Sequence, residues 1–413
     1  MLYLINPATP DDVKITDFLI KKFEKTHPGI KVKVDYVPAG EVSQKILLRV
    51  AGNTPLDVVN LNDTAFPKFV ENGVFYPLDE FIKNDPDFRL EEYHPSAIEC
   101  AKIQGKLYSL PPIFGTVICF YNKTLFRKAG LPYPKDGWTW EEFRYVCQKL
   151  TVDQNKDGKP EQFGCGGIEF WDWTPMLFQN GGRILDENGK CVLNSKENIA
   201  TLQFVKDMYT KDKSVVSQIT FPGVFTGGGR ARGSGELFGT GRIGLQFGGL
   251  ELIKKFPSNL DWDIVAPPEK RGGKKYFHGG FWGYGIISGS KNKKLAWELV
   301  KFLTSKPVLE EVVDGVKKGK WTIMAPPSIK SLQRDFLLSV CPGKHIDSYF
   351  YCLQYPEFGL AHAWASAVFN EISGRYNIQE NLMGITTGDL KTLLDNMTRE
   401  VNARLRGLHR KLK

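Results

Sequence analysis

The stretch LYLINPATPDDVKITDFLIKKFEKTHPGIKVKVDYVPAGEVSQKILLRVAGNTPLDVVNL, residues 2–61, decides the fold class. Two kinds of segment alternate along this stretch. Short segments that are apolar throughout, or in which apolar and polar residues alternate, are typical of strands, and between them lie segments whose apolar residues have helical spacing. The expected strands are residues 2–5, 30–36 and 56–61, and the expected helices are residues 11–23 and 43–51. Asp11 and Asp12 can cap the first helix. This order predicts a parallel α/β sheet with right-handed crossovers, in which ligands bind at the carboxyl ends of the strands.

A second α/β unit follows, with an amphipathic helix near residues 198–209 and an apolar strand near residues 243–247. Proline pairs stand beside changes of pattern at Pro111-Pro112, Pro267-Pro268 and Pro326-Pro327. Each pair is either an ordinary rigid loop or a crossing between lobes. A chain of 413 residues also exceeds the usual size of one domain. We therefore expect two discontinuous lobes, residues 1–112 with 270–325 and residues 113–269 with 326–413.

Composition and charge indicate a soluble globular protein. The net charge of +9 comes from Lys and Arg spread among nearly as many acids, so no nucleic-acid partner is expected. The dense basic tail at residues 404–413 reads as a frayed, solvated terminus. No apolar run approaches the ~20 residues of a membrane span. The seven cysteines form no CxxC pair, which predicts buried thiols rather than a zinc site or a disulfide framework.

One block of the sequence is specific enough to indicate a family. It contains YNK at 121–123, LF at 125–126, AGLP at 129–132 and WTWEEF at 138–143. This block resembles the extracellular solute-binding proteins of carbohydrate ABC importers, the group of maltose-binding and glycerol-phosphate-binding proteins. The resemblance covers nearly the whole chain and includes GKLYSLP at 105–111 and QNGG at 179–182.

The resemblance implies a two-lobed, type II periplasmic-binding-protein-like α/β fold with three hinge crossings and a ligand cleft between the lobes. It implies a carbohydrate ligand, which we expect to be an oligosaccharide, and delivery of that ligand to the permease subunits of an ABC transporter after hinge closure. A monomer in the periplasm, or anchored to the outside of the membrane, is expected. The absent leader, the many cysteines and Leu250, where the family often has an aromatic residue, depart from the pattern.

Aromatic side chains are the first group of expected ligand contacts, because the C–H faces of a sugar ring need flat apolar platforms. The neighbours of several tryptophans are polar residues or glycines, which suggests loops rather than core; Trp262 and Trp297 are read as core. The expected contacts are Trp171, Trp173, Phe281, Trp282, Trp321 and Trp364.

Polar side chains are the second group, because the hydroxyl rim of a sugar needs donors and acceptors. We expect Asn62, Asp63 and Thr116 to contribute from the first lobe and its crossing, and Gln179 and Asn180 from the second. An alternative role for Asp63 is to cap a helix over residues 64–70.

The segment TGGGRARGSG at 226–235 leaves open an anionic ligand. Arg230 and Arg232 could grip a carboxylate or phosphate, as in a sensor-type binding protein for an anionic sugar. The alternative is a surface loop with solvated arginines. No GKS or GKT follows, so a nucleotide loop is not indicated.

A further loop has the odd-position oxygens of a calcium site. Asp153, Asn155, Asp157 and Glu161 fit the spacing, but position twelve is Gly164 instead of the bidentate Glu. An Asx-rich turn explains the same residues. No cofactor is expected apart from this possible structural calcium.

No catalytic motif is present, since the chain has no HExxH or GxSxG and no histidine in a nucleophile or metal pattern. An enzyme is therefore not expected. The alternative from another class is a carbohydrate-active enzyme, which would need two carboxyl groups on opposed sides of the ligand.

Overall fold

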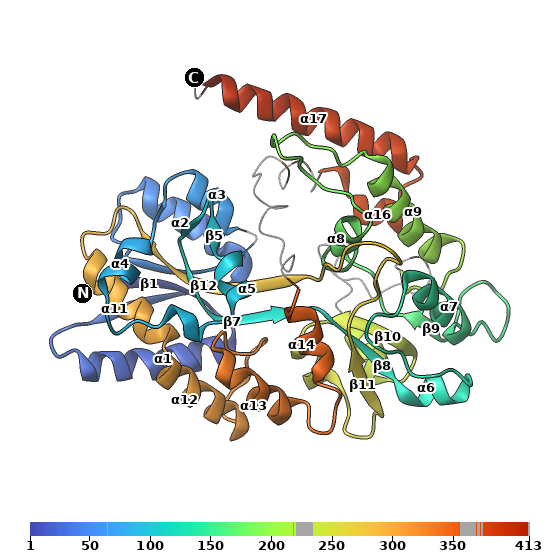
Figure 1. The fold of residues 1–413 in the computed structure, drawn as a ribbon, viewed down its shortest axis with the longest axis horizontal. Coiled ribbons are helices and arrows are strands. Elements are labelled where there is room, and N and C mark those ends of the chain that lie inside the picture. The colour runs from blue at the N-terminus through green and yellow to red at the C-terminus, as the bar shows by residue number, and fades with distance from the viewer. Residues whose placement is uncertain are drawn as a thin grey trace. The chain divides into compact units, whose positions relative to one another are not determined.

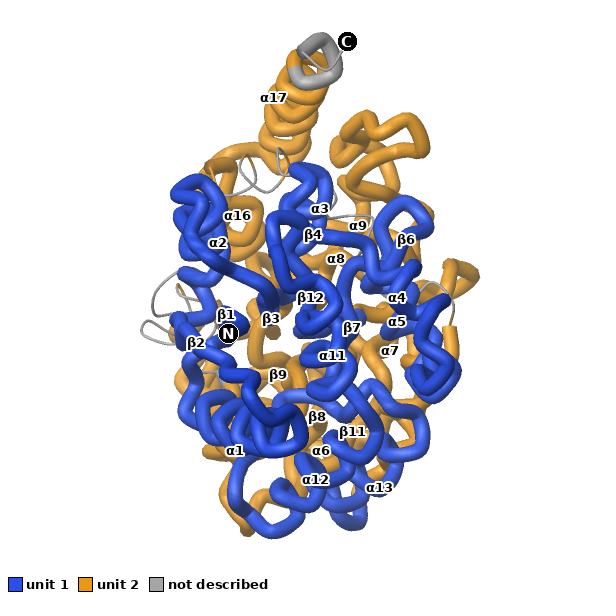
Figure 2. The backbone as a smooth tube through the Cα atoms, turned by 90° about the vertical axis from the view of Figure 1, so that its left-hand side faces the viewer, with its two compact units in different colours: residues 1–115, 279–343 blue, residues 116–278, 344–413 orange. Residues whose placement is uncertain are grey.

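The computed structural model describes residues 1–63, 65–217, 219, 234–355, 369, 372 and 375–411. The chain divides into two compact units (Figure 2): unit 1 is residues 1–115 with 279–343, and unit 2 is residues 116–278 with 344–413. Both units are discontinuous and the chain passes between them three times, as expected.

The positions of the crossings differ from the expected ones. Residues 270–278 belong to unit 2 and residues 326–343 to unit 1, and the first crossing lies after Gly115 instead of Pro112. The proline pairs stiffen segments inside a unit; for example, Phe114 N–H donates to the Pro326 carbonyl at 3.0 Å. The crossings instead adjoin Gly115, Gly279 and Gly343, whose backbones bend with the least steric restriction.

Unit 1 contains a six-stranded sheet in the order β2-β1-β3-β12-β4, with β7 beside β12. Its strands are β1 (Leu2–Pro7), β2 (Val32–Val37), β3 (Val58–Asn62), β4 (Phe75–Tyr76), β7 (Leu110–Thr116) and β12 (Gly279–Ile287). The pairs β1–β2 and β1–β3 are parallel, which confirms the prediction from residues 2–61, whereas β12 enters antiparallel to β3.

Helices cover both faces of the unit 1 sheet; α1 lies below it in Figure 1 and α2 above it. The helices of unit 1 are α1 (Pro10–Thr26), α2 (Val42–Ala51), α3 (Phe66–Glu71), α4 (Asp79–Asn84), α5 (Pro95–Cys100), α11 (Lys293–Thr304), α12 (Lys306–Lys317) and α13 (Lys330–Val340). The N-cap of α1 is Thr9, whose hydroxyl accepts the Asp12 N–H at 3.2 Å, so Asp11 and Asp12 stand in the first turn instead of capping it.

Unit 2 contains a four-stranded sheet in the order β11-β8-β10-β9. Its strands are β8 (Ile118–Asn122), β9 (Phe163–Cys165), β10 (Ile243–Gly248) and β11 (Trp262–Val265). Its helices are α6 (Lys123–Lys128), α7 (Trp140–Leu150), α8 (Phe170–Gln179), α9 (Lys196–Thr210), α10 (Ser234–Gly239), α14 (Asp347–Leu353), α16 (Ile378–Leu382) and α17 (Leu390–Lys411). The helix and strand expected near residues 198–209 and 243–247 are thus α9 and β10.

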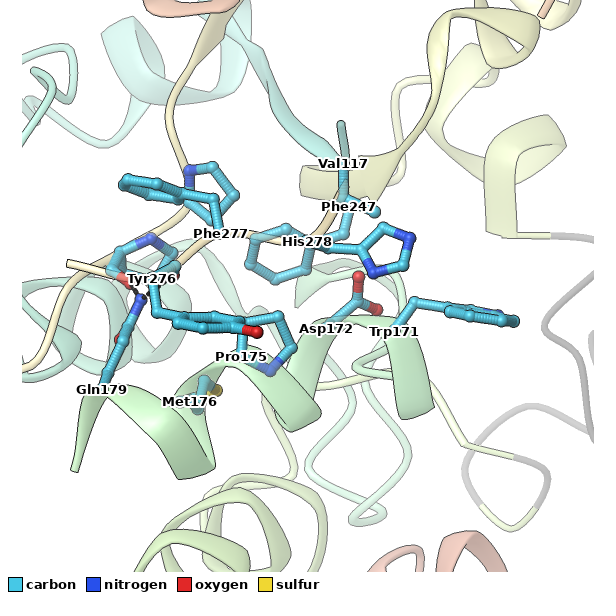
Figure 3. Close-up of a pocket in the computed structure, with 12 residues that line it drawn as sticks. Val117, Trp171, Asp172, Pro175, Met176, Gln179, Phe247, Tyr276, Phe277 and His278 are labelled. Atoms are coloured by element: carbon cyan, nitrogen blue, oxygen red, sulfur yellow. Dashed lines mark hydrogen bonds between the residues drawn. The ribbon is translucent and has the colours of Figure 1, made fainter. Parts of the chain in front are cut away.

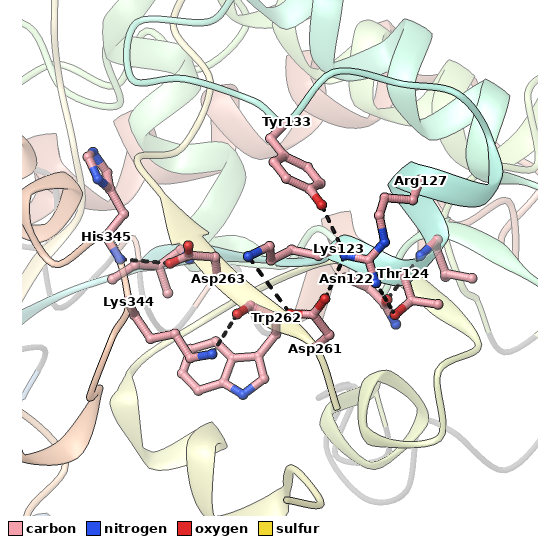
Figure 4. A network of polar contacts seen from close by, with 12 residues as sticks. Asn122, Lys123, Thr124, Arg127, Tyr133, Asp261, Trp262, Asp263, Lys344 and His345 are labelled. Atoms are coloured by element: carbon pink, nitrogen blue, oxygen red, sulfur yellow. Dashed lines mark hydrogen bonds and ion pairs between the residues drawn. The ribbon is translucent and has the colours of Figure 1, made fainter. Parts of the chain in front are cut away.

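The chain returning at the third crossing is fixed to β11 of unit 2 (Figure 4). Lys344 Nζ donates to the Trp262 carbonyl at 2.8 Å and lies 4.4 Å from the centre of the indole ring. His345 N–H donates to Asp263 Oδ1 at 2.7 Å. Trp262 is buried, as expected of a core residue, and its ring and carbonyl hold this crossing in place.

The seven cysteines all lie in the described part of the chain, and each is buried as a thiol, as expected. Burial raises the pKa of Cys119, Cys147 and Cys352 well above the ordinary thiol value, which keeps these sulfurs protonated and unreactive. None of the helices in the described residues has both the length and the apolar character that spanning a bilayer needs.

Candidate functional site

A pocket in unit 2 gathers aromatic, apolar and polar side chains (Figure 3). Three parts of unit 2 supply most of it: helix α8, the segment between β11 and β12, and the strand β10. The lining residues are Val117, Trp171, Asp172, Pro175, Met176, Gln179, Phe247, Pro267, Pro268, Tyr276, Phe277 and His278.

Helix α8 presents two tryptophans in different directions. The sequence suggested a loop here, but Glu169 and Asp172 form a capping box in which Glu169 N–H donates to Asp172 Oδ2 at 2.8 Å, and the helix begins at Phe170. Residues two apart on a helix point to different faces. Trp171 therefore lines the pocket, whereas Trp173 is buried and its Nε1 donates to Gln379 Oε1 at 3.0 Å.

The opposite side of the pocket is the segment ending at the second crossing. Tyr276 stacks on Phe178 with ring centres 4.6 Å apart, and its carbonyl accepts Gln179 Nε2 at 3.0 Å. The His278 carbonyl accepts Thr116 Oγ1 at 2.7 Å, and the imidazole packs edge-on against Trp171, 5.1 Å between ring centres. Backbone and ring contacts thus fix the orientation of these side chains.

Burial disfavours the charged forms of two ionisable groups of the pocket, His278 and Asp172. Burial lowers the pKa of His278 to about 4, so the imidazole is neutral. Burial also raises the pKa of the Asp172 carboxyl well above its ordinary value, against the opposing effect of the hydrogen bond from Glu169. The pocket therefore combines ring faces with a neutral imidazole and a carboxyl whose protonated form is favoured by burial, which suits a polyhydroxylated ligand.

The expected polar residues of unit 2 serve mainly to hold the fold. Gln179 lines the pocket, but its Oε1 accepts Trp140 Nε1 at 2.7 Å and its Nε2 donates to backbone carbonyls. Asn180 Nδ2 donates to the Glu197 carbonyl and to Thr201 Oγ1, which ties α8 to α9. Thr116 is buried and bonded to His278. Among the expected unit 2 residues that the structure describes, Trp171 is thus the one whose side chain both lines the pocket and keeps exposed surface.

In unit 1, Asn62 and Trp282 pair across β3 and β12, and both are half-buried. Asp63 is also half-buried, and its N–H donates to the Phe281 carbonyl at 3.1 Å. The alternative capping role of Asp63 is wrong, because α3 begins at Phe66 and Asn62 Oδ1 accepts the Ala65 N–H instead.

Two further aromatic residues expected at the ligand are buried in unit 1. The ring centres of Phe281 and Phe66 lie 6.0 Å apart. Trp321 Nε1 donates to the Val312 carbonyl at 2.9 Å, and its ring packs on Phe18. Arg230, Arg232 and Trp364, the other expected contacts, lie outside the described residues.

Sequence reasoning missed Asp172, Tyr276 and His278. The aromatic pair Tyr276-Phe277 before the glycines at 279 and 280 resembles the pair Phe281-Trp282 after them, which was recognised. That symmetry was the available indication. Nothing in the sequence marks His278, because its importance comes from the packing of its ring against Trp171.

The loop considered for calcium is an Asx-rich turn. Asp153 Oδ2 accepts the Gly158 N–H at 2.9 Å, Asn155 Oδ1 accepts the Asp157 N–H at 3.0 Å, and Glu161 Oε2 accepts the Gln154 N–H at 2.8 Å. Within the described residues, no three side chains of the types His, Cys, Asp or Glu gather to hold a metal ion. A calcium ion in this loop stays a prediction.

The two α/β units, joined by three crossings, and the aromatic pocket define the class: a solute-binding protein with the type II periplasmic-binding-protein fold. The particular family follows from the sequence. The chain belongs to the bacterial extracellular solute-binding proteins, whose sequence model matches residues 6–310.

Individual relatives agree with this membership. A putative binding protein of Brucella abortus is 26% identical over 293 residues, which are 69% of this chain and 67% of the relative. The arabinooligosaccharide-binding protein of Bacillus subtilis is 30% identical over 207 residues, 48% of this chain and 45% of the relative. The structure of an ABC substrate-binding protein from Listeria monocytogenes in complex with cycloalternan superposes with a TM-score of 0.79 at 25% identity, covering 98% of both chains.

Proposed function

We propose that this protein binds an oligosaccharide and delivers it to the permease subunits of an ABC importer. The observation that carries the proposal is the pocket of unit 2, in which Trp171 and Tyr276 offer ring faces beside the Asp172 carboxyl and the neutral imidazole of His278. Aromatic faces with a few convergent polar groups are what a sugar ring requires.

The names of related proteins support the same ligand class. The relatives include a maltotriose-binding protein of Pyrococcus abyssi and the arabinooligosaccharide-binding protein of Bacillus subtilis, and the Listeria protein was solved with cycloalternan. These ligands differ in sugar and in linkage, so they support an oligosaccharide as the class without choosing one.

A binding role fits the pocket better than catalysis. Glycoside hydrolysis by the common mechanisms needs two carboxyl groups facing the scissile bond. Asp172 is the one carboxyl among the residues that line the pocket of the described chain. We therefore propose that the ligand leaves unchanged. The proposal extends to a monomer without a nucleic-acid partner that works in the periplasm or anchored outside the membrane.

A thermal-shift screen tests the proposed function. Purified protein is heated with neutral oligosaccharides, uronate oligomers and sugar phosphates, because a ligand that binds only the folded state raises the melting temperature. We expect a rise of several degrees with one class and recovery of the intact sugar afterwards. Conversion of the sugar would favour the enzyme, and no rise with any sugar would reject carbohydrate binding.

A further inference from the structure

One buried polar atom in the pocket has no partner in the described protein. His278 is half-buried, and its Nδ1 is a buried atom that makes no hydrogen bond to any described residue. The imidazole and the Asp172 carboxyl turn toward the same space, with Trp171 beside them (Figure 3). Buried polar atoms are nearly always satisfied, so an unpaired one at the wall of a pocket indicates where a ligand group belongs.

The charge of the pocket limits what that ligand group can be. None of the twelve lining residues, all in the described chain, is Lys or Arg. The nearest lysine in sequence, Lys275, donates to the hydroxyls of Tyr351 and Tyr355 at 2.5 and 2.8 Å and lies 3.7 Å from Glu269. The ammonium group of Lys275 is therefore already bound by these three side chains.

We propose that this pocket selects an uncharged sugar and that His278 Nδ1 accepts a hydrogen bond from one of its hydroxyl groups. The inference rests on the proposed function and narrows it to neutral carbohydrates. A neutral imidazole with its proton on Nε2 is an acceptor at Nδ1, which matches a hydroxyl donor. Trp171 is in contact with the imidazole, and its indole then covers the apolar face of the sugar ring whose hydroxyl group donates to His278.

A charged sugar would be disfavoured in either protonation state of Asp172. If the carboxyl is protonated, an incoming uronate or phosphate loses its hydration with no cation among the lining residues to replace it. If the carboxyl is ionised, the ligand meets a like charge. Neither protonation state of Asp172 favours an anionic sugar. The discrimination against anionic sugars therefore does not depend on whether the Asp172 carboxyl is protonated.

Calorimetric titration separates this inference from the proposed function. The probes are maltotriose, an arabinotriose and a galactotriose as neutral sugars, and trigalacturonate as a charged sugar of equal length. We expect one neutral trisaccharide to bind at least about tenfold more tightly than trigalacturonate. Equal or tighter binding of trigalacturonate overturns the inference and leaves sugar binding intact, whereas binding of none of the four overturns both.

Two variants then test the role of Nδ1. His278→Phe keeps a ring against Trp171 but removes the acceptor, and His278→Asn places an amide atom near the position of Nδ1. With the neutral trisaccharide that binds best, we expect His278→Phe to lose about tenfold or more in affinity and His278→Asn to recover most of it. Wild-type affinity in His278→Phe, with a folded protein shown by circular dichroism, overturns the assignment.

Discussion

The hydroxyl of Thr116 donates a 2.7 Å hydrogen bond to the carbonyl of His278, so the residue after the first crossing is tied to the residue before the second. The Thr116 N–H in turn donates to Tyr349 Oη at 3.1 Å, on the helix that follows the third crossing. All three points lie inside unit 2, and the same bonds hold His278 at the wall of the pocket. The pocket is therefore built on the segments by which the chain enters and leaves this unit.

Replacing Thr116 by Val tests this tie. The substitution keeps the shape but leaves the buried His278 carbonyl without its donor, which we expect to lower the free energy of unfolding by about 1–3 kcal/mol. Urea unfolding measures the change. Thr210→Val is the control, because the exposed Thr210 donates only to its own helix at Lys206, and we expect a change within about 0.5 kcal/mol. Equal losses of unfolding free energy in the two variants would show that the hydrogen bond from Thr116 to His278 adds no more stability than an ordinary surface contact.

Gln179 is expected to act on stability before it acts on the ligand. Gln179→Leu leaves the Trp140 Nε1–H and the Lys270 N–H without their shared acceptor, so we expect a loss of about 2 kcal/mol or more. Gln203→Leu on the exposed face of α9 is the matched control and should change little. A Gln179→Leu protein of wild-type stability that no longer binds sugar would instead support the direct ligand contact expected from the sequence.

The loop at residues 153–161 is expected to keep its shape without a metal. Its side-chain oxygens already accept backbone N–H groups, so a chelator should leave the melting temperature unchanged. Asp157→Ala should cost about 1 kcal/mol with or without calcium, since Asp157 Oδ1 accepts the Lys159 N–H. A melting temperature that rises with added calcium in the wild type and not in Asp157→Ala would establish the metal site.

Two half-buried histidines, His94 and His278, should make the protein less stable as the pH falls. Burial lowers the pKa of His278 and of His94 to about 4, whereas an unfolded histidine titrates near 6.5. Between these values the unfolded chain binds protons that the native protein does not, so stability declines as the pH goes down from about 6.5 toward 4. The raised pKa of Asp172 works in the opposite direction, because there the native state binds the extra proton.

His278→Phe isolates the contribution of one histidine. Because Phe does not titrate, unfolding free energies measured at several pH values should fall less steeply in this variant, by at most about 1.4 kcal/mol per pH unit. Asp172 is present in both proteins, so its effect is largely common to the two curves. Parallel curves for the wild type and the variant would mean that His278 is not buried in a neutral state.

The fold was predictable because the sequence patterns that specify its strands and helices are local. The alternation in residues 2–61 gave β1, α1, β2, α2 and β3 nearly at their observed bounds, since strand and helix periodicities depend on neighbouring residues. The crossings were less predictable: a Pro-Pro pair reports a stiff segment, and stiffness is equally useful inside a unit, as at Pro326-Pro327.

The candidate site was predictable only in part, because burial and partners decide a side chain's role. Gln179 and Asn180 have the chemistry of sugar contacts, yet the structure engages both in backbone and side-chain bonds. The segment around Trp171 was expected to be a loop, whereas it is a helix in which Asp172 is part of the capping box and lines the pocket. Such roles depend on long-range packing, which residue types alone do not reveal.

The two tryptophans of α8 provide the sharpest test of where the ligand binds. They stand two residues apart on one helix, Trp171 at the pocket and Trp173 in the core. Trp171→Ala should weaken binding of the best neutral sugar by about tenfold or more and lower the melting temperature less than Trp173→Ala, because the half-buried Trp171 ring packs against His278 at the pocket and not in the core.

Trp173→Ala should give the reverse result. Removing a buried indole and its bond to Gln379 costs about 3–5 kcal/mol in unfolding free energy. Sugar affinity in whatever fraction stays folded should be close to that of the wild type, because Trp173 does not line the pocket. Calorimetry and urea unfolding on both variants measure the two effects independently. If Trp173→Ala lost affinity while Trp171→Ala bound normally, the ligand would have to lie elsewhere, and the pocket of unit 2 would be a packing feature.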